Sequence, residues 1–461
     1  MTAQASRRPH IVVIVADDLG WGDVSFHGSR QIPTPNIDTL AGDGLALHHY
    51  YVQSSGAATR SALMTGLYPI HTGIKHASHI CISARLIPLS GGIVRCHIVL
   101  TIKYAFMVNI PHIGFLFEHI SKGAHAVNAS WWTNGYWSKR FIHAFFLQLF
   151  MNAEIFFFFN QWPCREMRSP KWKIAPLHNC SVPLLLYLAH QAVHVGNAYH
   201  PLEAPSSYVK KFRYIKDLRR RIFAGMVAAL DQSVGDVFRA LQRKGILEDT
   251  IVLLTSDSGG AAGGVEQGVG SNWPLRGTKK TLWEGGVRAV GLLWSAKLAR
   301  GRVASQLIHR SAYFPLTNAD SCGDITDLGS IDGKDLWTVL VDDRPSPRTE
   351  LLYNIDYRWK LAAIRVGPYK LVLGASSSDQ FDDWYEPIES DATNPYLESA
   401  ALRKALFTDC ALLAKLFYRL QEFQLTNKPP LNRPPSPAAN PALHCNVWVP
   451  FMDSEVTGLR K

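Results

Sequence analysis

Cysteine is scarce in this 461-residue sequence. Its seven cysteines form no Cys-x-x-Cys pair, and their odd number leaves at least one without a partner. Such sparse cysteine excludes a small disulfide-stapled scaffold and leaves the redox compartment open. The apolar content of 47% and charged content of 18% are those of a globular protein, and the length suits a large domain with a smaller one.

Long hydrophobic runs are also lacking. The apolar run near the N-terminus, residues 11–16, is too short for a signal peptide and has no cleavage site after it. The one stretch of membrane-spanning length, 141–159, carries polar side chains at His143, Gln148, Asn152 and Glu154. We therefore expect no membrane span.

Acidic residues nearly vanish between positions 76 and 180. This stretch holds ten lysines and arginines against three glutamates, and so supplies +7 of the net charge of +11. Because the excess belongs to one segment and follows no regular face, we expect no nucleic-acid partner. Periodic patterns also fade here, so residues 76–181 are interpreted as an atypical insertion or as a translated non-coding stretch.

Alternating strand and helix patterns fill most of the remaining sequence. Buried strands are predicted at 11–16, 182–194, 250–260 and 287–294, and helices at 34–44, 60–66 and 222–245. This alternation predicts an α/β fold with a doubly wound, mixed but mostly parallel sheet flanked by helices. We predict this domain over 9–320, a smaller C-terminal α+β sheet domain over 321–427 with a hairpin at 362–374, and a proline-rich irregular tail over 428–461.

Polar side chains follow three of the predicted strands. Asp17 and Asp18 come after the first, His194 closes the second, and Asp257 follows the third. Ligands of doubly wound sheets bind beyond the carboxyl ends of the strands, so we expect these residues to share one site. A pair of aspartates alone is usually a helix cap or a solvated turn, but a third strand-end aspartate favours a Ca²⁺ or Mg²⁺ site.

Three basic side chains belong to or lie near this predicted site. Arg60, at a predicted helix start, is suited to clamp an oxyanion, and Lys279 and His194 are each suited to act as a general acid or as an anion contact. Each of the three also has an ordinary structural interpretation, as a surface arginine or as a packed side chain.

Several long motifs occur in an order that resembles one family. They are "PHIVVIVADDLGWGDVSFHGS", "TPNIDTLAGDG", "TRSALMTGLYPIHTG", "VLLTSDSGG" and "NWPLRGTKKTLWEGGVR". Together they resemble the sulfatases, in particular the arylsulfatase B-like branch. The resemblance implies an alkaline phosphatase-like fold, hydrolysis of sulfate esters of small molecules or glycans, one Ca²⁺ ion, and a lysosomal or secretory location. It also implies a formylglycine nucleophile, made from a cysteine in a Cys-x-[Pro/Ala]-x-Arg motif.

The resemblance assigns roles to individual positions. It makes Asp17, Asp18 and Asp257 metal ligands and sets Ser258 where the family has asparagine. It also makes Arg60 the residue that holds the nucleophile, and His194 and Lys279 the sulfate contacts. The cysteine position is occupied by Gly56. Glycine has no side chain to oxidise, so the formylglycine cannot form.

A further signature of the family, a Gly-Lys-Trp-His-Leu-Gly stretch, is not found between 76 and 182. The sequence therefore predicts a sulfatase-family chain whose catalysis is lost or impaired. The alternatives are a pseudoenzyme that binds sulfated glycans through Arg60, Lys279 and His194, and an enzyme in which Ser55 or Thr59 replaces the nucleophile.

Overall fold

The computed structural model describes residues 9–75, 142–147, 154–160, 184–196, 200–311, 330–374, 381–389 and 409–430. The centre of this part of the chain is an eight-stranded sheet with the strand order β4-β5-β6-β1-β7-β8-β2-β9. Its strands are β1 (His10–Ala16), β2 (Leu45–Leu47), β4 (Ile142–Leu147), β5 (Glu154–Asn160), β6 (Leu184–His190), β7 (Thr250–Ser256), β8 (Gly291–Ser295) and β9 (Arg302–Ala304).

The core of the sheet is parallel. Strands β5, β6, β1 and β7 run side by side in one direction, while β4 and β8 pair antiparallel on either side of them. β2 is antiparallel to β8 and parallel to β9. The prediction of a mixed, mostly parallel sheet is thus confirmed.

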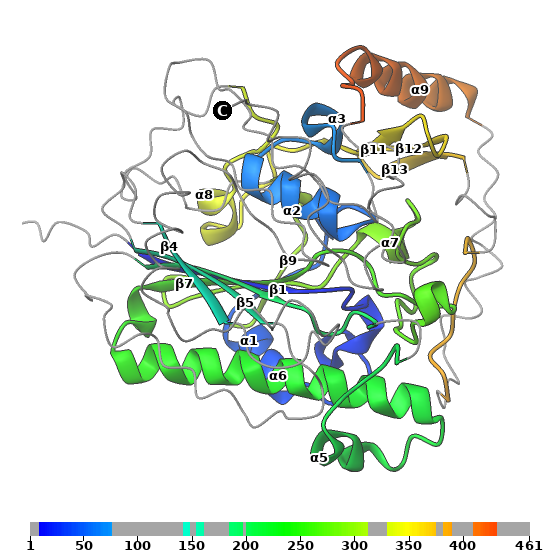
Figure 1. Cartoon of the computed structure of the whole chain (residues 1–461). Helices are drawn as coiled ribbons and strands as arrows, with labels where there is room; N and C mark the ends of the chain where they lie inside the picture. Colours follow the sequence, from blue (N-terminus) through cyan, green and yellow to red (C-terminus); the bar gives the residue numbers. More distant parts are fainter. Residues whose placement is uncertain are drawn as a thin grey trace, which may run out of the picture.

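Helices cover both faces of this sheet (Figure 1). α1 and α6 lie on one face, and α2 and α8 lie on the other. The helices of the described residues are α1 (Pro35–Asp43), α2 (Gly56–Thr65), α3 (Pro69–Thr72), α5 (Ser206–Val209), α6 (Leu218–Lys244), α7 (Glu284–Val287), α8 (Trp337–Val341) and α9 (Cys410–Leu425). Short 3-10 turns and the two-stranded pair of β3 (Tyr50–Tyr51) and β10 (Ile308–His309) complete this domain.

Strand β1 is apolar on both sides because both of its faces are covered. Val12 and Ile14 pack in the hydrophobic cluster that contains α1 and α6. Val13 and Val15 point the other way, as successive residues of a strand must, into the cluster that contains α8. The continuous apolar run therefore reflects a strand buried between two helical layers.

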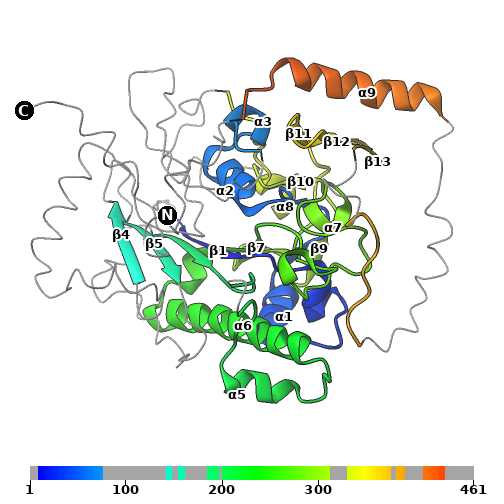
Figure 2. The ribbon, with the colours of Figure 1, turned by 45° about the vertical axis from the view of Figure 1, so that its right-hand side comes forward.

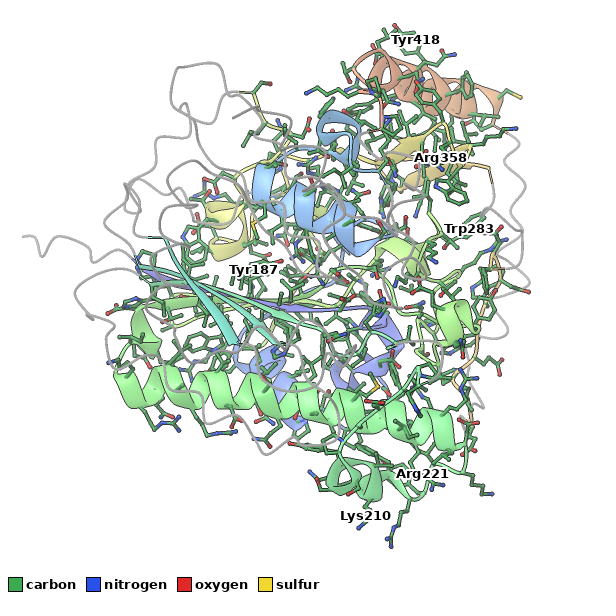
Figure 3. The ribbon with its side chains drawn as sticks, in the orientation of Figure 1. Tyr187, Lys210, Arg221, Trp283, Arg358 and Tyr418 are labelled. Atoms are coloured by element: carbon green, nitrogen blue, oxygen red, sulfur yellow. The ribbon has the colours of Figure 1, made fainter. Side chains whose placement is uncertain are left out.

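A three-stranded antiparallel sheet forms the smaller unit, with α9 packed on it (Figure 2). Its strands are β11 (Glu350–Asp356), β12 (Leu361–Val366) and β13 (Tyr369–Leu373). Leu416 and Leu420 of α9 are buried in its cluster, whereas Tyr418 is exposed on the outer side of the helix (Figure 3). The 362–374 hairpin is confirmed by β12 and β13. The domain boundaries themselves stay a prediction.

Most of the atypical segment 76–181 and the tail beyond residue 430 lie outside the described residues. The two stretches of 76–181 that are described are strands β4 and β5, which form an antiparallel pair over most of the 141–159 run and end at Asn160. Among the helices of the described residues, none combines the length and the apolar character that a membrane crossing needs.

Candidate functional site

The ends of β1 and β7 bring four predicted residues together. These strands are adjacent and parallel, so the residues that follow them meet at one edge of the sheet. The backbone N–H of Asp18 donates to Oδ1 of Asp257 at 3.2 Å, and the hydroxyl of Ser258 donates to Oδ1 of Asp18 at 2.8 Å. Asp17, Asp18, Asp257 and Ser258 are all buried.

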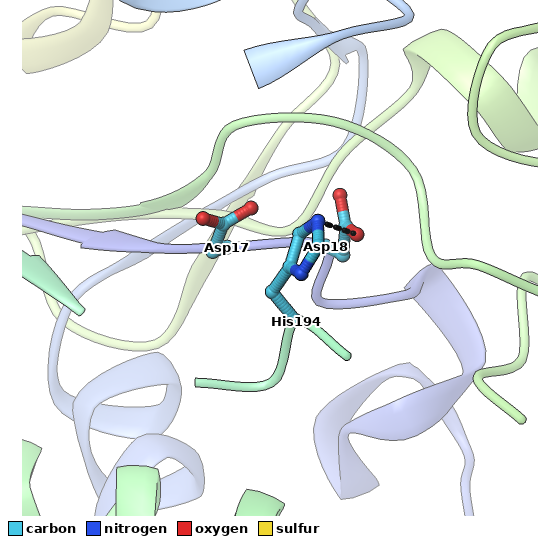
Figure 4. A group of neighbouring side chains, drawn as sticks. All are labelled: Asp17, Asp18 and His194. Carbon is cyan, nitrogen blue, oxygen red and sulfur yellow. Dashed lines mark ion pairs between the residues drawn. The ribbon is translucent and has the colours of Figure 1, made fainter. Parts of the chain in front are cut away.

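His194 reaches the same place from the segment that follows β6. Two backbone hydrogen bonds tie this segment to Asp17, from Asp17 N to Ala192 O at 3.0 Å and from Val193 N to Asp17 O at 2.8 Å. His194 Nε2 lies 3.4 Å from Oδ2 of Asp18, and its ring is turned toward that carboxylate (Figure 4). The strand itself ends earlier than predicted, at His190, so His194 is placed by the loop.

Arg60 enters from helix α2, which begins at Gly56, four residues before the predicted start. Its guanidinium group is buried and donates from Nε and Nη2 to Oδ2 of Asp257, at 2.9 and 2.7 Å, and from Nη2 to Oδ2 of Asp17 at 3.1 Å. Arg60 therefore joins the ends of two strands through a buried, charge-assisted network.

Gly56 faces the carboxylate of Asp257. A Cβ atom built on Gly56 would lie 2.2 Å from Oδ2 and 3.0 Å from Cγ of that aspartate. This is far inside van der Waals contact, so in this arrangement the Asp257 side chain fills the space that a side chain at position 56 would need. The missing nucleophile thus leaves no vacancy beside Asp257.

The ammonium group of Lys279 has three hydrogen-bond partners. Its ammonium group lies 2.5 Å from Oδ2 of Asp18, 2.7 Å from Oε2 of Glu266 and 3.0 Å from Nε2 of His194. The His194 Nδ1 atom contacts the carbonyl of Val195 at 2.5 Å, which assigns the ring hydrogen to Nδ1 and leaves Nε2 to accept from Lys279. The side chains predicted for the site are therefore gathered in one buried cluster, and Gly56 beside them is half-buried.

Glu266 was not predicted from the sequence. It lies in the glycine-rich stretch after β7, and nothing in its neighbourhood of small residues marks it as a site residue. The nearby lysine pair, which offers cations without an assigned anion, is the only signal from which a carboxylate partner could have been inferred.

Charge and burial shift the pKa values of the cluster in opposite directions. Burial, reinforced by Asp257, raises the pKa of Asp17 to about 6. Burial acts on Asp18 in the same sense, but the positive charge of Lys279, together with its hydrogen bond, outweighs it and lowers the Asp18 pKa. Burial also opposes the charge of Lys279, yet Asp18 and Glu266 raise its pKa above the ordinary value. Negative charge at Asp17 is thus left incompletely compensated by protein cations.

The residues present fit a hard divalent cation. Ligand atoms of Asp17, Asp18 and His194 lie within 4.8 Å of one another, and the Asp257 carboxylate and Ser258 hydroxyl adjoin them. Carboxylate and hydroxyl oxygens are the ligands that Ca²⁺ and Mg²⁺ prefer. The raised pKa of Asp17 indicates a carboxylate for which an added positive charge would be favourable.

The described residues form an α/β fold with a buried cluster of charged side chains at the carboxyl edge of its sheet. Two solved structures share the fold. The crystal structure of Ps i-CgsB in complex with k-i-k-neocarrahexaose gives a TM-score of 0.57 at 21% identity, covering 92% of this chain and 94% of that one. The structure of BT4656 in complex with its substrate D-glucosamine-2-N,6-O-disulfate gives 0.51 at 13% identity, covering 91% and 98%.

Sequence comparison narrows the class to a family. The profile of the family named Sulfatase matches residues 9–89 and 173–317. Arylsulfatase J of Mus musculus is 31% identical over an alignment 517 residues long, which covers 97% of this chain and 81% of that protein. The chain belongs to the sulfatase family, a family of sulfuric ester hydrolases.

Proposed function

We propose that this chain binds the sulfate group of a sulfated small molecule or glycan and hydrolyses its ester far more slowly than an intact sulfatase. Sulfatase-family membership supports the substrate class. The proposed loss of activity rests on the close approach of Asp257 to position 56. Gly56 has no nucleophilic side chain, and the Asp257 carboxylate fills the space beside it.

The basic side chains supply the chemistry of binding. His194 and Lys279 form a hydrogen-bonded pair at the site, and Arg60 sits beside Gly56. We assign His194 and Lys279 as the sulfate contacts. The Lys279 ammonium group is a suitable donor to sulfate oxygens, and His194 Nε2, which accepts from Lys279 in this structure, would become a donor once the ring is protonated. Arg60 holds Asp17 and Asp257 in place through hydrogen bonds to both carboxylates.

Calcium is the metal that we propose for the acidic side of the cluster. Asp17, Asp18 and Asp257 would hold it, with Ser258 as a weaker oxygen donor in place of the family's asparagine. When bound, the ion would neutralise charge on the sulfate oxygens. The carboxylates alone keep the site negative on this side, so they would otherwise oppose the approach of an anion.

Turnover and binding test the proposal separately. The purified chain should hydrolyse 4-nitrocatechol sulfate at least about 10⁴-fold more slowly than an active arylsulfatase, the loss typical of removing a central catalytic group. Phenyl sulfate should nevertheless bind in isothermal titration calorimetry, and Lys279→Ala should weaken that binding. Lys297→Ala, at an exposed lysine outside the cluster, is the matched control and should leave binding unchanged. Turnover at a normal arylsulfatase rate would refute the proposed impairment.

A replacement nucleophile is the second candidate, and the structure separates the two hydroxyls considered for it. The Thr59 hydroxyl accepts from the backbone N–H of Gln53 at 2.8 Å and is occupied. The Ser55 hydroxyl is buried and makes no hydrogen bond with the part of the chain that the structure describes. If Ser55 serves as a nucleophile, Ser55→Ala should abolish any residual phosphatase or sulfatase activity, while Thr59→Ser should retain it.

The compartment belongs to the same proposal. Family resemblance favours the lysosome or the secretory route, where the sequons Asn128-Ala-Ser and Asn179-Cys-Ser would become glycosylation acceptors. Expression in cultured animal cells tests this, since glycosidase treatment should then lower the apparent mass. Both sequons lie outside the described residues.

A further inference from the structure

Glu266 places a carboxylate on the basic side of the site. It lies in loop 263–268, between β7 and α7, and its two oxygens contact two different lysines. Oε2 lies 2.7 Å from Nζ of Lys279, and Oε1 lies 2.8 Å from Nζ of Lys280. His194 Nε2 is also within 3.5 Å of Oε2. One carboxylate thus meets both side chains that we assign to sulfate.

Lys279 has no donor left for a ligand. An ammonium group offers three N–H donors, and here they face Asp18, His194 and Glu266. A sulfate oxygen can therefore reach Lys279 only if one of these partners leaves. Side chains of Asp18 and His194 are 2% and 5% exposed, whereas that of Glu266 is 17% exposed. Glu266 is the partner that can move outward into solvent.

The backbone of the loop is suited to such a movement. Glu266 and Gln267 both have left-handed backbone angles, with φ of 51° and 64°, a region that side chains other than glycine rarely adopt. Gly263 and Gly264, with φ of 66° and 86°, precede them and provide a pliable base. The carboxylate–lysine contacts therefore hold the loop in a conformation that its own residues disfavour.

We propose that Glu266 is a built-in competitor for the sulfate site: its carboxylate occupies Lys279 and Lys280 in place of an anionic ligand, and loop 263–268 must swing out before a sulfate group binds. This inference rests on the proposed function, because it takes Lys279 as the sulfate contact. A carboxylate and a sulfate ester both present anionic oxygens, so they compete for the same donors. A ligand therefore binds only if it contacts these lysines more strongly than the Glu266 carboxylate does.

Glu266→Gln tests the inference with little change of shape. The amide keeps the length of the side chain but loses its charge, so its hold on Lys279 weakens. Calorimetric titration with phenyl sulfate should show binding about tenfold tighter than in the unaltered chain, as expected when one charge-assisted contact no longer competes. Glu248→Gln, which removes the same charge from an exposed position on the 3-10 turn Leu247–Asp249, should leave the affinity unchanged.

The outcomes separate this inference from the proposed function. If the unaltered chain binds phenyl sulfate and Glu266→Gln binds it equally or more weakly, Glu266 is not a competitor and only the inference is overturned. If neither binds, and Lys279→Ala gives the same flat titration, the proposed function is overturned, and the inference with it. Detectable binding by Glu266→Gln alone would support the inference, but would contradict the proposed binding of sulfate by the unaltered chain.

Discussion

The substitution Gly56→Ala adds a single methyl group and tests how closely Asp257 packs against position 56. Gly56→Ala would set a Cβ atom 2.2 Å from Oδ2 of Asp257, which Arg60 holds through two hydrogen bonds. Overpacking of this kind costs about 1–3 kcal/mol, and moving Asp257 also loosens a buried ion pair. Alanine in a helix recovers at most about 1 kcal/mol over glycine. We expect a net loss of about 2 kcal/mol in the free energy of unfolding.

Gly42→Ala is the matched control for this experiment. Gly42 lies in α1, and a Cβ atom there would meet no atom of the described residues within 4 Å. That substitution should stabilise the chain by about 0.5–1 kcal/mol, which sets the two variants about 3 kcal/mol apart in urea denaturation followed by circular dichroism. In an Asp257→Ala background the clash is absent, and Gly56→Ala should become neutral or stabilising. A Gly56→Ala variant as stable as Gly42→Ala would refute the reasoning.

Three further predictions concern metal, pH and a buried ion pair. Millimolar Ca²⁺ should raise the thermal unfolding midpoint, EDTA should reverse the rise, and Asp17→Asn should abolish it, because ligands of the folded state stabilise by mass action. Burial lowers the pKa of His190 to about 4. Between pH 6.5 and 4 the His190 imidazole is protonated in the unfolded state but stays neutral in the folded state. The free energy of unfolding is therefore unaffected by His190 above pH 6.5, and it falls by up to about 1.4 kcal/mol per pH unit between 6.5 and 4. Arg220→Met should cost about 3–5 kcal/mol in urea denaturation, because it strands buried Asp23, whose carboxylate lies 2.8 Å from the guanidinium group.

Each of these has an outcome that would contradict it. A midpoint that responds equally to Ca²⁺ in the unaltered chain and in Asp17→Asn would show that the ion binds elsewhere. His190→Gln should flatten the acid slope of stability by one proton, and an unchanged slope would exclude His190 as its source. Arg213→Met, at an exposed arginine, should leave stability within about 0.5 kcal/mol. An equal loss in Arg220→Met and Arg213→Met would contradict the role of burial.

That the site residues lie close together was predictable, because their positions follow from the direction of the strands. Residues after parallel strands meet at one edge of a sheet, so the sequence pattern alone predicts that Asp17, Asp18, His194 and Asp257 lie together. Strand β1 was equally clear, since a continuous β-branched run is typical of a strand covered on both faces.

The pairings inside the site were not predictable, because they depend on side chains that are distant in sequence. Arg60 joins Asp17 and Asp257, which follow two different strands, and no local pattern encodes that choice. The predicted start of α2 was wrong by four residues, because Gly56 is a poor helix former and tertiary contacts override its preference. Glu266 was missed because its loop has no periodic pattern at all.

The hydrophobic cluster around α3 has a consequence for biosynthesis. Tyr68 and Ile70 are buried against Leu352 and Ile355 of the small sheet and against α9. Leu352 leaves the ribosome about 280 residues after Tyr68, which at 5–20 residues per second is a delay of about 14–57 s. Throughout that interval Tyr68 and Ile70 lack the contacts with the small sheet and α9 that bury them in the folded chain. The nascent chain therefore presents a binding surface for chaperones until the small sheet is made.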